Sequence, residues 1–495
     1  MTKDFSRRAF LAGAGATLGV PAMANAPLTS ILPAPKPADY AKRSLPSIDH
    51  LISEAGLGGK YGFVVADART GTILEARNPV LPLPPASVAK AITGAYALSE
   101  LGTDHQFETR IVATGPVVNG KVEGDLVLVG GGDPTLDTDA LAGMARALKA
   151  AGVVQIAGAF RVTGAYLPYQ RVIDPGQPDH LGYNPAVSGL NLNYNRVHFQ
   201  WKRAGGTYDL LMDARSDNLR PPVKMARMAV VDRKVPIFTY KDAAGTDSWT
   251  VAKAALGNGG SRWLPVRRPD LYAGEVFQVL ARSQGVVLPR PEVGADIPAG
   301  TVLVTHSSAP LPEIVKGMLK YSTNLTAEVL GLAASAQADQ KPADLAGSAA
   351  QMSEWAQQAL GASRIAFADH SGLSDASRLS ARDMVRALVT LGPSGELHGL
   401  LKAVAPKIDN PPVAGYAIRA KTGTLNFVST LAGYVTLPDG RELAFAIFTA
   451  DMERRAGIAR ANRERPKGAK SWSRRSRRLQ HQLISRWATL YGPDG

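Results

Sequence analysis

The chain of 495 residues contains no cysteine. Disulfide bonds, thiol nucleophiles and cysteine-ligated zinc sites are therefore excluded. Its 8 histidines do not fall in an H-E-x-x-H or comparable metal-binding spacing. We therefore expect neither a metal nor another cofactor, and the chemistry must come from groups such as serine, lysine and the backbone.

Long apolar runs are also missing. The best candidate, Leu11 to Ala22, is short and rich in glycine, so it does not predict a transmembrane helix. It follows Arg7-Arg8 and precedes Ala24-Asn25-Ala26, a small-residue cleavage pattern. Residues 1–26 are thus predicted to be an export signal resembling the twin-arginine type, and residues 27–45 a proline-rich linker. We expect a soluble, periplasmic mature protein without a transmembrane span.

Acidic residues are outnumbered, with 42 Asp and Glu against 56 Lys and Arg and a formal net charge of +14. Much of the excess lies in one late stretch, Arg454 to Arg478. No aromatic-interleaved basic motif accompanies it, so we do not expect nucleic acid as a partner. By default the stretch is a solvated face or a mobile loop. The alternative is attraction to anionic envelope polymers or lipid headgroups.

The expected helices and strands suggest one α/β domain interrupted by an insertion. Two strands are predicted between residues 61 and 77, and three more between 418 and 449. The intervening region 105–300 has many short β-like runs broken by glycine and proline, which indicates a mostly β insertion. The flanking parts, 46–104 and 301–490, also carry helical patterns, among them 86–101, 311–335, 343–360, 380–391 and 471–490.

Ser87-Val88-Ala89-Lys90 is the only Ser-x-x-Lys in the chain. Because roughly one such match is expected by chance at this length, the pattern alone also fits a helix-capping serine with a solvated lysine. Ser87 stands in the first turn of the helix predicted at 86–101. Free backbone N–H groups and the helix dipole favour an anionic oxygen there, and a residue three positions on shares the same face. We interpret Ser87 as a nucleophile and Lys90 as its proton acceptor.

Two further motifs strengthen this interpretation. Lys421-Thr422-Gly423, a triplet with roughly a one-in-ten chance of occurring, stands at the end of a predicted strand, whose edge can bind an extended peptide. A Ser-x-Asn motif occurs twice, as Ser216-Asp217-Asn218 and as Ser322-Thr323-Asn324. The first lies in the insertion with no helix on either side, whereas the second lies at a helix–helix break between the other two motifs. We therefore choose Ser322 and Asn324.

The motifs Ser-x-x-Lys, Ser-x-Asn and Lys-Thr-Gly, in this order, are those of penicillin-binding proteins and class A β-lactamases. The long separation between the first two makes the chain resemble the D-alanyl-D-alanine carboxypeptidase/endopeptidases, the class C low-molecular-mass penicillin-binding proteins. Gly132-Asp133-Pro134-Thr135-Leu136 and Ser371-Gly372-Leu373-Ser374 are further similar phrases. The resemblance implies a β-lactamase/transpeptidase-like domain, an antiparallel sheet flanked by helices, that is split by a large, mostly β inserted region.

The resemblance also implies a role for each motif residue. Ser87 would attack a D-Ala-D-Ala bond of a peptidoglycan stem peptide and form an acyl-enzyme, and a β-lactam would acylate it in the same way. Lys90 would accept the proton, with its pKa lowered by repulsion from Lys421. Ser322 would relay the proton to the leaving amine, and Asn324 would bind the substrate amide. Lys421 and Thr422 would bind the terminal carboxylate, and Gly423 of the same motif is also counted as substrate-binding. The N–H groups of Ser87 and Thr424 would form the oxyanion hole.

Some positions depart from the family pattern. Asp375 stands where many relatives carry an arginine that meets a side-chain carboxylate, and His370 stands where glycine is usual. Asp179 and Tyr183 lie about where relatives place contacts from the insertion, which makes Asp179 a candidate substrate contact. The alternatives are a β-lactamase or esterase on the same fold and a catalytically silent envelope-binding protein, whose expected loss of Ser87 or Lys90 is not seen.

Overall fold

The computed structural model of the protein describes residues 40–493, except 244, 339–341 and 407–414. The predicted export signal and residues 27–39 of the predicted linker therefore lie outside the described residues, whereas residues 40–45 of the linker are described and include α1. A five-stranded antiparallel sheet with the order β19-β20-β21-β1-β2 joins the two ends of the chain. Its strands are β1 (Lys60–Asp67), β2 (Ile73–Arg77), β19 (Ala417–Leu425), β20 (Val428–Thr436) and β21 (Glu442–Ala450).

Both faces of this sheet are covered by helices, as the alternation of β1 shows. Phe63 and Val65 point into a core with α2 (Ile48–Ala55) and α12 (Ala469–Tyr491), and Val64 points into the core on the other face. The second core contains α3 (Ala89–Leu101), α6 (Leu311–Tyr321), α7 (Asn324–Gln337), α8 (Leu345–Leu360), α9 (Ala381–Leu391) and α10 (Glu396–Leu400). The predicted antiparallel sheet flanked by helices is confirmed. Among the described residues, no helix has the length and apolarity needed to cross a bilayer.

The inserted region has a sheet of its own, with the order β15-β8-β6-β3-β16. Its strands are β3 (Glu108–Ala113), β6 (Leu126–Gly130), β8 (Phe160–Thr163), β15 (Glu292–Val293) and β16 (Thr301–Ser307), packed with α4 (Thr138–Ala150) and α5 (Pro269–Ser283). Because β16 pairs with β3, the insertion ends after Ser307. The boundary predicted at residue 300 falls just before β16, a strand that pairs with this sheet.

Three smaller sheets complete the insertion. They are β9 (Arg196–Ala204) with β10 (Thr207–Asp213) and β14 (Gly259–Pro265), β11 (Ala226–Val231) with β13 (Thr246–Ala252) and β12 (Phe238–Ala243), and β4 (Val117–Val118) with β5 (Lys121–Val122) and β7 (Gln155–Ile156). Elsewhere lie α1 (Tyr40–Arg43), α11 (Met452–Ala456), β17 (Ile365–Ala366) and β18 (Arg378–Leu379).

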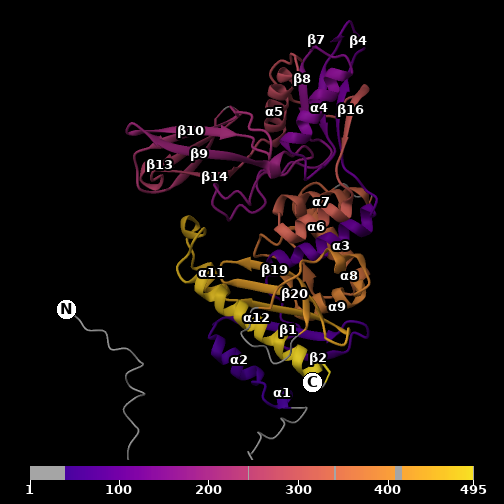
Figure 1. Cartoon of the computed structure of the whole chain (residues 1–495), viewed down its shortest axis with the longest axis vertical. Coiled ribbons are helices and arrows are strands. Elements are labelled where there is room, and N and C mark those ends of the chain that lie inside the picture. The colour runs from indigo at the N-terminus through magenta and orange to yellow at the C-terminus, as the bar shows by residue number, and fades with distance from the viewer. Residues whose placement is uncertain (1–39, 244, 339–341, 407–414, 494–495) are drawn as a thin grey trace, which may run out of the picture.

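The insertion and the split domain meet beside the edge strand β19. Figure 1 shows the insertion at the upper end of the molecule, with β9, β10 and β14 projecting sideways above α11. The two parts are joined there by an ion pair of 3.1 Å between Arg262 of β14 and Glu464, which lies between α11 and α12. The edge of the sheet that carries Lys421-Thr422-Gly423 therefore faces the inserted region.

Candidate active site

The structure brings the three motifs together around one serine. Ser87 lies in a 3-10 turn, Ala86–Val88, that leads directly into α3. Lys90 Nζ donates to Ser87 Oγ at 3.2 Å and to Asn324 Oδ1 at 2.8 Å. Lys421 Nζ donates to Ser322 Oγ at 2.9 Å. Segments far apart in the sequence thus place a hydroxyl, two amines and an amide in one cluster.

The turn that carries Ser87 is tightly held. Ala86 has a φ of +46°, a left-handed conformation that residues with a side chain rarely adopt. The hydroxyl of Thr430 on β20 donates to the Pro85 carbonyl at 2.7 Å. A Cβ on Gly423 would lie 2.1 Å from Thr430 Oγ1 and 3.0 Å from the Ser87 nitrogen. The glycine of the third motif is therefore required for β19 to pack against the Ser87 turn.

The second motif occupies the break between α6 and α7. Ser322 ends α6 with a φ of +60°, and Asn324 is the first residue of α7. Asn324 Nδ2 donates to the carbonyl of Tyr183, at 2.8 Å. A loop of the insertion therefore reaches the site, although it was only loosely aligned from the sequence.

Lys90 is fully buried and has a third hydrogen bond, to the Ser371 carbonyl at 2.7 Å. Burial lowers its pKa, whereas the charges of Glu328 and Asp369 raise it. Burial also lowers the pKa of Lys421, with repulsion from Lys90 as a smaller cause. The expectation that repulsion from Lys421 is what lowers the pKa of Lys90 is thus corrected, since removal of the ammonium group from water is the larger effect.

Sequence reasoning missed Glu328. This residue is fully buried on α7, one helical turn after Asn324. Its carboxylate accepts the backbone N–H groups of His370 at 2.9 Å and Ser371 at 3.0 Å. Burial and, next, repulsion from Asp369 raise its pKa, while the hydrogen bonds from Ser371 and His370 and the charge of Lys90 lower it. The available signal was that Glu328 is the one charged residue of an otherwise neutral helix.

His370, which departs from the family pattern, is accommodated by a compensating glycine. Its ring is fully buried, and a Cβ on Gly331 of α7 would lie 2.2 Å from it. The ring nitrogen Nε2 lies 2.8 Å from Ser348 Oγ. Burial lowers the pKa of His370 to about 3, so the imidazole is neutral. We assign it a packing function beneath the site.

Arginines neutralise both Asp375, which departs from the family pattern, and Asp179, the candidate substrate contact. Asp375 forms an ion pair with the buried guanidinium of Arg455. Asp179 pairs with Arg460 at 3.1 Å and is not among the residues that line the cavity beside Ser87. The structure therefore does not bring Asp179 to the site as predicted, because the late basic stretch binds its carboxylate.

The rejected motif Ser216-Asp217-Asn218 lies elsewhere. Ser216 Oγ accepts the N–H of Leu219 at 3.1 Å, and Asn218 donates to Asp139 of α4 at 3.2 Å. These are local contacts within the insertion. The structure thus favours Ser322 and Asn324 as the members of the cluster.

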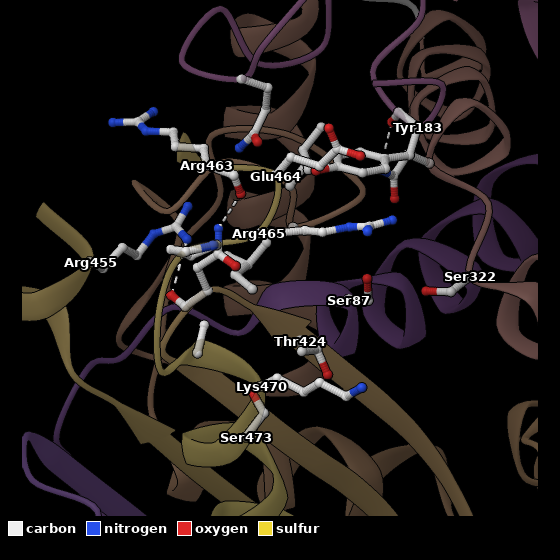
Figure 2. Close-up of a pocket in the computed structure, with 18 of the residues that line it drawn as sticks. Ser87, Tyr183, Ser322, Thr424, Arg455, Arg463, Glu464, Arg465, Lys470 and Ser473 are labelled. Atoms are coloured by element: carbon white, nitrogen blue, oxygen red, sulfur yellow. Dashed lines mark hydrogen bonds between the residues drawn. The ribbon is translucent and has the colours of Figure 1, made fainter. Parts of the chain in front are cut away.

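A cavity of about 910 Å³ opens beside Ser87. Figure 2 shows Ser87, Ser322 and Thr424 on one side of it and Tyr183 and the segment 463–465 on the other. The cavity therefore combines a serine hydroxyl, a neighbouring lysine whose pKa is lowered by burial, and an exposed strand edge. This arrangement is suited to acyl transfer from a peptide.

Comparisons with known proteins agree with the geometry. The model of the D-Ala-D-Ala carboxypeptidase 3 (S13) family matches residues 45–465. A D-alanyl-D-alanine carboxypeptidase of Actinomadura sp. (strain R39) is 30% identical over 466 residues, which cover 85% of this chain and 84% of that protein. The crystal structure of penicillin binding protein 4 from Haemophilus influenzae superposes with a TM-score of 0.70 at 21% identity, covering 89% of this chain and 100% of that one. The same protein complexed with a novel β-lactam gives a TM-score of 0.69.

The family resemblance inferred from the three motifs is confirmed by these matches. The chain therefore belongs to the D-Ala-D-Ala carboxypeptidase 3 (S13) family and is an enzyme of the D-alanyl-D-alanine carboxypeptidase type.

Proposed function

We propose that the protein releases D-alanine from peptidoglycan stem peptides, and cleaves D-Ala-D-Ala-type cross-links, through an acyl-enzyme on Ser87. The observation that carries the proposal is the contact of the buried Lys90 amine with Ser87 Oγ, next to Asn324. Burial favours the neutral amine of Lys90, which is the form that can accept a proton.

The reaction proceeds in two stages. Ser87 Oγ attacks the peptide carbonyl carbon and its proton passes to Lys90 Nζ, after which the C–N bond breaks. The leaving nitrogen takes a proton through Ser322, whose hydroxyl is bonded to Lys421. Water then attacks the ester, forms a new terminal carboxylate and restores Ser87.

The substrate lies as an extended segment along the edge of β19. Lys421 and Thr422 bind the terminal carboxylate, and the arriving negative charge favours the ammonium form of Lys421. The backbone N–H groups of Ser87 and Thr424 stabilise the developing oxyanion. The close approach of Gly423 to the Ser87 turn supports this assignment, because Thr424 directly follows Gly423 in β19.

We also propose that the protein is exported to the periplasm through its twin-arginine-like signal, and that β-lactams acylate it. The signal lies outside the described residues, so its composition is what supports export. The related penicillin binding protein 4 has been captured with a β-lactam, which supports acylation here.

The test is incubation with a fluorescent penicillin, comparing the wild type with Ser87→Ala. We expect lasting label on the wild type and none on the variant, with equal thermal unfolding midpoints as the control. No label on a folded wild type would contradict the proposal, and rapid turnover of the penicillin would indicate a β-lactamase instead. Release of D-alanine from a pentapeptide and cleavage of cross-linked dimers measure the two peptidase activities separately.

A further inference from the structure

The inserted region contains a cavity of its own, which shares no lining residue with the cavity beside Ser87. It has a volume of about 480 Å³ and lies between α5 and the beginnings of β11 and β13. In Figure 1, α5 and β13 both lie in the upper part of the molecule, above β19. We call this cavity the insertion cleft, and the catalytic mechanism makes no use of it.

One face of α5 forms the floor of the insertion cleft. The residues that α5 contributes are Leu271, Glu275, Gln278, Val279 and Arg282. They follow one another at helical spacings of three and four, so they lie on the same side of the helix. Leu271 and Val279 are only half-buried. The floor therefore offers apolar surface to a ligand.

Cationic side chains from three separate segments surround this floor. They are Lys224, Arg227, Arg282 and Arg290, and all four are exposed. Within the part of the chain that the structure describes, the side chains of Lys224, Arg282 and Arg290 form no hydrogen bond and no ion pair. Arg227 donates from Nε to the Lys224 carbonyl at 3.2 Å. Most of the charged donors in the cleft are thus available to a ligand.

The one acid among the described lining residues, Glu275, is already engaged. Its carboxylate accepts the backbone N–H of Lys224 through one oxygen and that of Met225, at 2.8 Å, through the other. Glu275 therefore holds the Lys224 segment against α5. Four cations against one carboxylate leave three positive charges in excess, which favours an anionic ligand.

The backbone that carries Arg290 is held against the same helix. Gln278 Nε2 donates to the carbonyls of the two residues before Arg290, at 2.9 and 2.6 Å. The next residue, Pro291, is buried, and a Cβ on Gly274 of α5 would lie 2.8 Å from its Cβ. The cations therefore project from anchored segments, which lowers the entropic cost of binding a ligand between them.

We propose that the insertion cleft binds a phosphate monoester, with the phosphate among the four cations and the organic part on Leu271 and Val279. Three of the four cations are arginines, whose planar guanidinium pairs bidentately with phosphate oxygens. A phosphate monoester carries roughly 1.5 to 2 negative charges at pH 7, which suits the excess better than one carboxylate. The cleft volume lies in the range of small-molecule sites.

The monoester belongs either to a soluble ligand or to a lipid headgroup such as that of phosphatidic acid. Phenyl phosphate is the soluble probe, and isothermal titration calorimetry with the whole chain measures its Kd. Benzoate keeps the ring and replaces the phosphate by a carboxylate. Cosedimentation with phosphatidylcholine vesicles that contain phosphatidic acid tests the lipid source. Vesicles with the phosphodiester lipid phosphatidylglycerol are the comparison.

The double variant Lys224→Gln/Arg282→Gln removes one cation from each side of the insertion cleft. Its matched control is Lys202→Gln/Arg203→Gln, which removes two exposed cations of β9 that do not line the cleft. Each variant loses one lysine and one arginine. Because all four side chains are exposed, both variants should keep the wild-type thermal unfolding midpoint.

We expect the wild type and the control to bind the monoester equally, and the double variant to bind it at least about tenfold more weakly. Binding of phenyl phosphate identifies a soluble ligand, whereas binding of phosphatidic acid vesicles alone identifies a lipid headgroup. Binding of neither probe, or equal binding by the double variant and the wild type, would overturn the proposal. So would benzoate binding as tightly as phenyl phosphate, or vesicle binding that does not distinguish phosphatidic acid from phosphatidylglycerol.

Discussion

Acylation of Ser87 should slow at low pH, and this acid limb of its pH–rate profile should move to lower pH when Glu328 is replaced by glutamine. In the proposed mechanism Lys90 must be neutral, so acylation falls as the pH drops through the pKa of Lys90. The carboxylate of Glu328 raises that pKa by attraction. Glutamine keeps the shape of the side chain and removes its charge, so the pKa of Lys90 falls and acylation persists at lower pH.

The structure bounds the size of this effect. Lys90 Nζ donates to the Ser371 carbonyl at 2.7 Å, and the Ser371 N–H donates to Glu328 at 3.0 Å. The backbone nitrogen and oxygen of Ser371 lie roughly 3 Å apart, so the Lys90 ammonium and the Glu328 carboxylate lie within about 9 Å of each other. At that distance, an effective dielectric constant of about 20 gives an attraction of about 2 kcal/mol. The acid limb should therefore move by about one pH unit or more.

The assay is the second-order rate constant for acylation by a fluorescent penicillin, measured against pH for the wild type and Glu328→Gln. Glu313→Gln, which neutralises an exposed carboxylate in the first turn of α6, is the control. Glutamine would direct its amide nitrogen at one of the two backbone N–H donors, which costs about 1–3 kcal/mol of stability. Thermal unfolding measures that cost separately, because the position of the acid limb does not depend on the folded fraction. An acid limb that stays in place, or moves to higher pH, in a folded variant would refute the reasoning.

Three further predictions concern packing and the choice of motif. Gly423→Ala should slow penicillin acylation by about a hundredfold or more, because its Cβ would lie 2.1 Å from a threonine hydroxyl beneath the Ser87 turn; a rate within a few-fold of wild type would contradict this. Gly331→Ala should lower the free energy of unfolding by about 1–3 kcal/mol through its clash with the His370 ring. Chemical denaturation should show that adding His370→Gly to the Gly331→Ala variant relieves this cost. If the stability losses of the two single variants simply add in the double variant, the clash is not their cause. Ser216→Ala should acylate at the wild-type rate whereas Ser322→Ala acylates slowly, and the reverse order would show that the wrong Ser-x-Asn motif was chosen.

The sequence by itself determined the chemistry and the class of fold. The motif at Ser87 and Lys90 needs only helical spacing, which is a local property, to place an amine on a hydroxyl. Alternate residues of β1 point into opposite cores, and α12 buries an apolar stripe with Trp472 and Trp487; both patterns likewise follow from the periods of strand and helix. The three motifs in order, together with the long separation between the first two, were enough to identify the family.

Only the tertiary structure decided which charges meet. Nothing near Glu328 in the sequence shows that its carboxylate accepts two N–H groups of a loop more than 40 residues away. The space for His370 depends in the same way on a glycine of another helix. Asp179 was predicted to contact substrate, but Arg460 pairs with it across 281 positions. The basic stretch, expected by default to be a solvated face or a mobile loop, supplies lining residues of the cavity beside Ser87. The physical reason is that a charge pattern gives the sign and the spacing of charges, whereas their partners depend on how distant segments pack.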